Sequence, residues 1–273
     1  MPLHSSLATV LEQFKTNQVV LLGERHGIAE NLDFIAKLVP DLWRIGVRNI
    51  ALEFFATENQ AKSDALVSSP EFDDQIARDL LFEYNVGWPF VEYQSIHKAV
   101  WEFNRANNAG MRVLHPSYIY DWTKWTGIRT EDSMQGVFHR GHVNEHRATV
   151  IADAVGRGEK VLGLFGAVHA INDKRTMTEL GFPDFRSVAQ ILEQQHSIKV
   201  SSVNINDALD GLWDAQIKTA KTLNPCNIDF EFISGRDFSQ VQRDWPDPDW
   251  QPTPTDEQQY WQIMHNRISA FLN

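Results

Sequence analysis

The sequence has little cysteine, no excess of positive charge and no long apolar run, and each absence excludes a class of protein. Cys226 is the only cysteine among 273 residues, so an internal disulfide and a cysteine-rich zinc site are both excluded. The formal charge of −11 disfavours non-specific binding to nucleic acid or anionic lipid, because both reward a basic surface. No stretch approaches the roughly 18 apolar residues of a membrane span.

The N-terminal segment also lacks the pattern of a secretory signal. Residues 1–15 contain neither a basic start nor a long apolar stretch that ends in small residues. A lipoprotein anchor would require an early cysteine, and none is present there. We therefore expect a cytoplasmic protein that binds neither nucleic acid nor membrane. The sequence leaves the oligomeric state open.

Continuous apolar runs of strand length predict a parallel sheet that is buried on both faces. These runs cover residues 18–23, 47–55, 111–115 and 160–166, with weaker candidates at 198–205 and 227–233. Helical patterns alternate with them at residues 7–14, 29–45, 56–90 (with a break at 68–70), 90–109 and 142–155. The alternation predicts an α/β fold with a mostly parallel central sheet and flanking helices. The first strand–helix–strand unit implies that its two strands pair in parallel.

The chain is short enough to form one hydrophobic core, and its apolar content of 42% is ordinary for a globular protein. We therefore expect a single α/β domain over residues 1–244. Residues 245–273 would form a proline-rich arm, from Trp245 to Pro254, followed by a C-terminal helix. The aromatic stretch from Tyr118 to Trp125 is expected to form part of a helical and aromatic cap over the sheet.

Polar residues follow three of the predicted strands, at the edge where open α/β sheets bind ligands. Two Gly-x-x-His motifs, GERH at 23–26 and GAVH at 166–169, end the first and fourth strands, and Glu53 ends the second. The glycine before each histidine is expected to let the backbone turn sharply. His26, Glu53 and His169 match the three-ligand set of a catalytic metal such as Mn, Co, Fe or Zn, with one position open for water.

Each of these residues also has a structural interpretation. A single Gly-x-x-His motif is common, and most such histidines are structural or solvated. Glu53 stands in the apolar sequence IALEFF, where a buried carboxylate costs several kcal/mol unless it is paired. Exposure at the strand end would explain Glu53 equally well. The three residues together favour a functional site more strongly than any one of them.

Further histidines lie close together in the chain. His142 and His146 stand at i and i+4 on a predicted helix, and His139 precedes them. Their spacing suits a metal pair, but the intervening glutamate of a His-Glu-x-x-His motif is missing. The start of a solvated helix is the simpler interpretation.

Aromatic residues near the third strand suggest a second class of ligand. His115 ends that strand, and Tyr118 and Tyr120 follow it. A flat apolar wall with a histidine or tyrosine ligand would suit haem, although aromatic residues more often fill a core or a cap. The chain contains neither a phosphate-binding loop nor the Gly-x-Ser-x-Gly elbow of serine hydrolases.

Several motifs occur in a particular order between Val19 and Ala170, which is more than half of the chain. They are LLGERHGIAEN, ALEFF, FNRAN, HRATVIA and LGLFGAVHA. The ordered set resembles the superfamily that contains the Tiki proteases, the haem-uptake protein ChaN and the erythromycin esterases. The resemblance implies an α/β fold, with peptide hydrolysis, haem binding or ester hydrolysis as activities of different members.

The resemblance implies roles for five residues of this chain: Glu24, His26, Glu53, Arg147 and His169. Arg147 corresponds to the arginine of a family pattern Arg-Asp-x-x-Met-Ala. This chain reads RATVIA, so the aspartate is missing and the methionine has become isoleucine. The departure puts a second carboxylate at this position in doubt, but not the arginine.

The preferred hypothesis is a hydrolase that acts on an ester or amide bond of a small molecule or a peptide. His26 or His169 would act as a general base, or both would bind a divalent metal together with Glu53. Arg147 would stabilise the oxyanion, and Glu24 would orient His26 or share the metal. Two alternatives stay open. One is a haem-binding protein without hydrolytic activity, and the other is a catalytically degenerate protein that binds a partner.

Overall fold

The computed structural model describes residues 3–24, 29–82, 91–120, 138–172, 185–205 and 227–229. The elements of its N-terminal half are α1 (Leu3–Gln13), β1 (Val19–Glu24), α2 (Ala29–Arg44), β2 (Val47–Leu52), η1 (Thr57–Asn59), α3 (Gln60–Ser68), α4 (Asp74–Phe82) and α5 (Val91–Asn107). They are followed by β3 (Arg112–Leu114), α7 (Val143–Gly156), β4 (Lys160–Gly166), α8 (Ala167–Ala170), α10 (Val188–His196), β5 (Val200–Asn204) and β6 (Asn227–Asp229).

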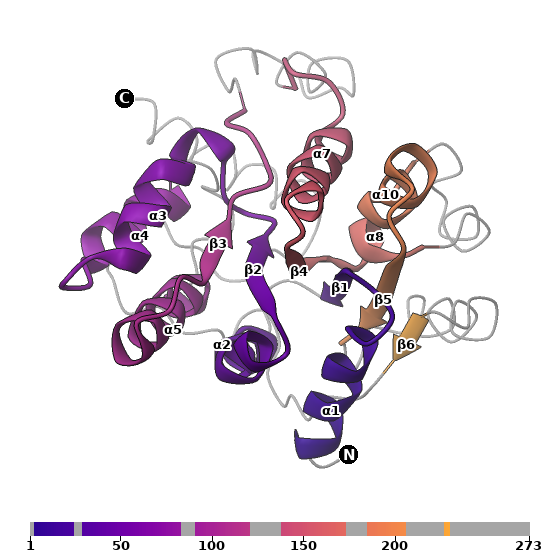
Figure 1. Cartoon of the computed structure of the whole chain (residues 1–273). Helices are drawn as coiled ribbons and strands as arrows, with labels where there is room; N and C mark the ends of the chain where they lie inside the picture. The colour runs from indigo at the N-terminus through magenta and orange to yellow at the C-terminus, as the bar shows by residue number, and fades with distance from the viewer. Residues whose placement is uncertain are drawn as a thin grey trace, which may run out of the picture.

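Six strands form one sheet in the order β3-β2-β4-β1-β5-β6, and all of the described pairings are parallel. Helices cover both faces, with α2 and α5 on one side and α7 and α10 on the other (Figure 1). The predicted α/β fold with a parallel central sheet and flanking helices is therefore confirmed. The α10 helix, which begins with a capping box between Ser187 and Gln190, was not anticipated from the sequence.

The prediction that the first two strands pair directly is wrong. β1 and β2 run parallel, but β4 lies between them and pairs with both. Its residues from Val161 to Gly166 are all buried, and so is the whole of β1. The strands with the longest apolar runs thus occupy the centre of the sheet, where both faces are covered by helices. This order places the end of β4 between the ends of β1 and β2.

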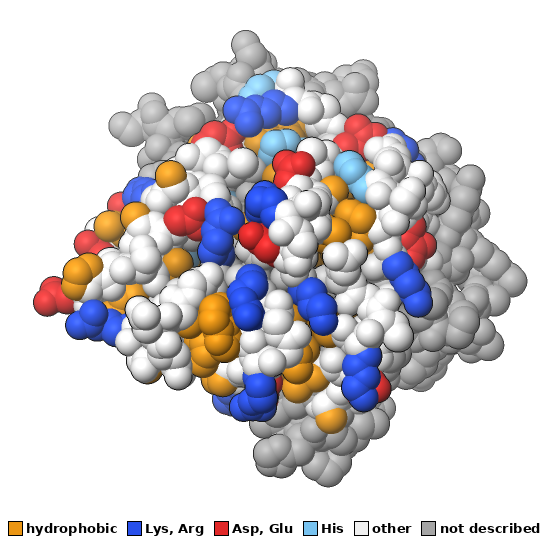
Figure 2. All heavy atoms as spheres, viewed as in Figure 1, with side chains coloured by type: hydrophobic (Ala, Val, Ile, Leu, Met, Phe, Trp, Pro, Cys, Tyr) orange, Lys and Arg blue, Asp and Glu red, His pale blue; other side chains and the backbone are white. Residues whose placement is uncertain are grey.

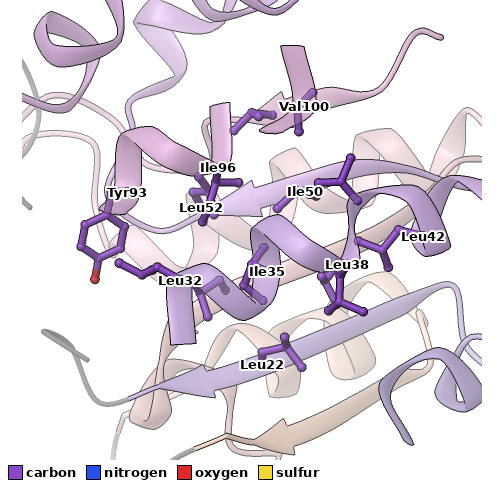
Figure 3. Close-up of a cluster of buried hydrophobic side chains, with 14 of the residues drawn as sticks. Leu22, Leu32, Ile35, Leu38, Leu42, Ile50, Leu52, Tyr93, Ile96 and Val100 are labelled. Atoms are coloured by element: carbon purple, nitrogen blue, oxygen red, sulfur yellow. The ribbon is translucent and has the colours of Figure 1, made fainter. Parts of the chain in front are cut away.

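The larger part of the core lies between the sheet and the pair α2 and α5 (Figure 3). Residues Leu32, Ile35, Leu38 and Leu42 of α2 recur every three or four positions, as expected for one face of a helix, and all are fully buried. They pack with side chains of β1, β2 and α5, including Leu22, Ile50, Leu52, Ile96 and Val100. Each such side chain contributes about 1.5–3 kcal/mol on burial, so this core fixes the sheet that carries the site.

Several predictions lie outside the described residues. The proline-rich arm and C-terminal helix at 245–273 are among them, as is most of the predicted cap, from residue 121 onward. Within the described parts of the chain, no helix is both long enough and apolar enough to cross a membrane.

Candidate functional site

Three adjacent strands bring their polar ends together at one edge of the sheet. Glu24 ends β1 and lies in register with Gly166, the last residue of β4. On the other side of β4, the backbone N–H of Glu53 donates to the carbonyl of Leu164. The end of β4, which leads into His169, is therefore flanked by two glutamates. Both are buried, with 3% of Glu24 and 6% of Glu53 exposed.

Three donors among the described residues contact the Glu53 carboxylate. Its Oε1 atom lies 3.0 Å from Nη2 of Arg147 and 3.3 Å from Nε2 of His169. Its Oε2 atom accepts a hydrogen bond of 2.6 Å from the backbone N–H of Gly166. A buried carboxylate is tolerated only when its charge and hydrogen-bonding capacity are satisfied, and these groups satisfy both. The strand-end exposure considered from the sequence does not account for Glu53.

His169 reaches Glu53 from α8, the single helical turn that follows β4. This turn packs closely on β1: a Cβ built on Gly23 would lie 3.1 Å from Cα of Ala167 and 3.4 Å from Cβ of Ala170. The absence of a side chain at Gly23 thus sets how near α8 approaches. The side chain of His169 is 18% exposed, and its ring centroid lies 5.4 Å from that of Phe185.

The expected sharp turn is present after Gly166, where β4 passes directly into α8, whereas the turn of the GERH motif lies outside the described residues. Gly23 continues β1, and Gly166 has a φ of −51°, which any residue can adopt. The glycines with positive φ among the described residues are Gly46, Gly141 and Gly158. At Gly23, close packing against α8 replaces backbone freedom as the physical reason for glycine.

Arg147 of α7 is almost completely buried and its three guanidinium nitrogens are all engaged. Nη2 contacts Glu53, Nε donates to the hydroxyl of Ser117 at 2.9 Å, and Nη1 donates to Oδ1 of Asn144 at 3.1 Å. The oxyanion role expected for Arg147 stays a prediction. In this structure its guanidinium holds the Glu53 carboxylate.

The side of the site nearest β1 is described in part. The phenol of Tyr93 donates a hydrogen bond of 2.9 Å to Oε1 of Glu24, and Tyr93 itself packs edge-on against Phe54. His26 lies outside the described residues, so its contacts with Glu24, Glu53 or His169 stay a prediction. In the parts of the chain that the structure describes, no three His, Cys, Asp or Glu side chains lie together in a way that could hold a metal ion.

The residues expected to meet haem are mostly enclosed. Tyr118 is fully buried and its phenol donates to the carbonyl of Gly141 at 2.6 Å. His115 is also fully buried, with Nε2 lying 3.1 Å from Nε2 of His97 and Nδ1 lying 3.3 Å from the carbonyl of Ala56. The expectation that Tyr118 and His115 face a ligand is therefore corrected, because neither reaches the surface. Tyr120 is partly buried and packs against Tyr118.

The histidines near the start of α7 do not form a metal pair in this structure. His142 is the N-cap of α7, and its Nδ1 atom accepts from the backbone N–H of Asn144. His146 instead places Nε2 3.0 Å from the hydroxyl of Thr57. Burial lowers the pKa of both histidines below the usual value. Figure 2 shows histidine side chains gathered at this end of the molecule, where α7 begins in Figure 1.

Three residues of the network were missed in the sequence: Ser117, Asn144 and Tyr93. Ser117 lies three positions after the end of β3, and this place near a strand end could have marked it as a candidate site residue. Asn144 and Tyr93 lie within helical patterns and carry no such signal, because their contacts with Arg147 and Glu24 depend on the packing of whole helices.

Comparisons with known proteins identify the fold but not a sequence family. No family model matches the chain, and no curated protein matches it. The structure of the type III effector HopBA1 is similar, with a TM-score of 0.50, 16% identity and coverage of 77% of this chain and 85% of that one. A ChaN of Campylobacter jejuni with cofacial haem binding matches with a TM-score of 0.51 and 16% identity, over 75% of this chain and 87% of ChaN. At this identity the likeness shows a shared fold.

Proposed function

We propose that the chain is a hydrolase of an ester or amide bond, with Glu53 and His169 as its catalytic pair. The observation that carries the proposal is the Glu53 carboxylate, buried at the carboxyl edge of the sheet and held 3.3 Å from the imidazole of His169. A carboxylate and an imidazole in contact are the parts of a general base. They lie where ligands bind in open parallel sheets.

In a metal-independent reaction, His169 would take a proton from a water molecule that attacks the substrate carbonyl. Glu53 would orient the imidazole and stabilise the imidazolium that results, as carboxylates do in comparable dyads. Arg147 and the N–H of Gly166 would keep the carboxylate in place throughout the reaction. His26 would serve as a second base from the end of β1, with Glu24 orienting it.

The described donors also fit two positions around a divalent metal. Imidazole nitrogen and carboxylate oxygen are both ligands of divalent metals such as zinc. Nε2 of His169 and Oε1 of Glu53 lie 3.3 Å apart and would hold the metal, with His26 as the third ligand. A metal bound there would lower the pKa of a coordinated water.

The test measures hydrolysis of a panel of p-nitrophenyl esters and fluorogenic peptides by untagged protein, with and without added Mn²⁺, Co²⁺, Fe²⁺ or Zn²⁺. His169→Ala and Glu53→Gln are expected to lose activity by about 100-fold or more. His196→Ala is the control, since it ends α10 beside the start of β5, at the opposite edge of the sheet. Inactive wild type under all conditions, or full activity in both site variants, would contradict the proposal.

Metal content distinguishes the two forms of the reaction. Protein purified without a chelator or a histidine tag should contain near-stoichiometric metal if Glu53 and His169 bind it. The His169→Ala variant should then lose this metal. Activity in metal-free wild-type protein would instead support the metal-independent reaction.

Haem binding is the second candidate function, supported by the fold shared with ChaN. Among the residues expected to bind haem, Tyr120 is the one that the structure leaves partly accessible. A haemin titration should then produce a Soret band that saturates at a defined ratio and is lost in Tyr120→Phe. Absorbance that neither saturates nor responds to the substitution would dismiss this function. A binding protein without catalysis remains the outcome if both tests fail.

A further inference from the structure

The segment that carries Glu53 forms a bulge in the pairing of β2 with β3. β2 pairs with β3 as far as Ala51 and Leu114, and the pairing resumes as a parallel bridge between Ala56 and Ser117. From Ala51 to Ala56 the chain advances five residues, whereas from Leu114 to Ser117 it advances three, so the bulge contains two extra residues. Bulges of this kind redirect a side chain next to a functional site. Here the bulge contains Glu53.

Ser117 holds this bulge through both its main chain and its side chain. Its N–H donates to the carbonyl of Phe55 at 3.1 Å, and its carbonyl accepts from the N–H of Thr57 at 2.7 Å. Its hydroxyl donates to the carbonyl of Glu53 at 2.7 Å and accepts from Nε of Arg147 at 2.9 Å. One hydroxyl therefore contacts both the backbone of Glu53 and the guanidinium that contacts the Glu53 carboxylate.

We propose that Ser117 is a positioning residue for the Glu53–His169 pair, an inference that rests on the proposed hydrolase function. The Ser117 hydroxyl fixes Glu53 at its backbone and, through Arg147, at its carboxylate. Without the hydroxyl, the Glu53 carbonyl loses a hydrogen bond, and Nε of Arg147 loses its acceptor in a region closed to water. The carboxylate would then no longer be confined at 3.3 Å from Nε2 of His169.

A purely structural serine would have different consequences from a positioning one. Loss of a structural hydroxyl lowers stability but leaves the turnover of the folded protein unchanged. Loss of a positioning hydroxyl lowers kcat in protein that is still folded, because small displacements of a catalytic group are costly. Substrate binding should be little affected, since Ser117 is fully buried and does not reach the surface.

Ser117→Ala tests the inference, with Ser63→Ala as the matched control. Ser63 is also fully buried, and its hydroxyl donates to the carbonyl of Val113, so the same atoms are removed away from Glu53. We expect Ser117→Ala to lower kcat by about 100-fold with KM changed less than about twofold. Ser63→Ala should retain wild-type kcat. If Ser117→Ala folds poorly, Ser117→Cys replaces it in the test, because cysteine keeps the shape of the side chain with a weak hydrogen-bonding group. We expect Ser117→Cys to lower kcat in the same way.

NMR can detect the hydrogen bond between Arg147 and Ser117 independently of hydrolytic activity. The Nε–H resonance of Arg147 in ¹⁵N NMR, assigned by its absence in Arg147→Lys, should be protected from exchange in wild type and in Ser63→Ala. It should lose that protection in Ser117→Ala.

The outcomes distinguish this inference from the function on which it rests. Wild-type kcat or a protected Nε–H in Ser117→Ala, while His169→Ala and Glu53→Gln are inactive, overturns the role of Ser117 alone. Wild-type protein that hydrolyses no substrate overturns the proposed function and this role together.

Discussion

Glu53 and Arg147 form a buried ion pair, with Oε1 and Nη2 3.0 Å apart and only 7% and 2% of the two side chains exposed. A pair of this kind adds little net stability, because both charges have lost their hydration. Removal of one partner is different, since the other charge then stays buried without compensation. The pair therefore links the stability of the fold to the position of the candidate catalytic carboxylate.

Arg147→Met should lower the free energy of unfolding by about 3–5 kcal/mol, as expected when one partner of a buried pair is removed. The measurement is urea unfolding at pH 7. Arg157→Met is the control, because its contact of 3.1 Å with Glu159 is made by a side chain that is 50% exposed. That variant should change stability by less than about 1 kcal/mol. Similar small effects for both arginines would contradict the prediction.

The buried histidine pair should make the fold sensitive to acid. Burial lowers the pKa of His97 to about 4, below the ordinary value of 6.5. Between these values the unfolded chain binds more protons than the folded chain, so stability rises with pH and is lost as the pH falls. The full difference corresponds to about 3 kcal/mol. Burial also lowers the pKa of His115, which acts in the same direction.

Urea unfolding of wild type and His97→Gln at several pH values between 4 and 7 tests this prediction. Comparison of the two proteins removes the contribution of carboxylates that titrate in the same range. The slope of stability against pH should be smaller in His97→Gln. Equal slopes in the two proteins would show that His97 does not titrate as its burial implies.

Gly23→Ala should displace α8, because the new Cβ would lie 3.1 Å from Cα of Ala167. We expect a loss of about 1–3 kcal/mol in stability, the usual cost of overpacking, and a larger loss of hydrolytic activity. Gly156→Ala serves as the control, since it ends α7 and nothing lies within 4 Å of a Cβ built there. Thermal unfolding and activity assays on both variants make the comparison. A Gly23→Ala protein with wild-type activity would show that α8 does not need this close approach.

Lys160 should stabilise the ends of two helices at the edge of the sheet opposite the site. Its Nζ atom lies 3.0 Å from the carbonyl of Phe14, just after α1, and 3.5 Å from that of Ile45, just after α2. Cations are favourable at such positions because helix C-termini carry partial negative charge. Lys160→Met should cost about 1–2 kcal/mol, measured by urea unfolding. The exposed Lys199, replaced by Met, should cost less than about 0.5 kcal/mol.

Local patterns in the sequence were sufficient for most elements of this fold, with α10 as an exception. Apolar runs predicted the strands, since strands buried on both faces need continuous apolar residues. The same runs identified Glu24, Glu53 and His169 as polar residues at strand ends, and the structure brings these ends side by side. Helices α2, α5 and α7 were predicted from their helical patterns.

The tertiary structure alone decided how these elements meet. Strand order set β4 between β1 and β2, and so put Gly166 against Glu53, 113 residues away in the chain. Packing of α7 made Arg147 a partner of Glu53, brought Ser117 to both, and enclosed Tyr118 and His115. Such contacts depend on the summed burial of many distant side chains, whereas the length and buried face of a strand or helix depend on residues a few positions apart. The sequence by itself therefore determined the parts of the site, and the packing of the sheet and its helices determined their arrangement.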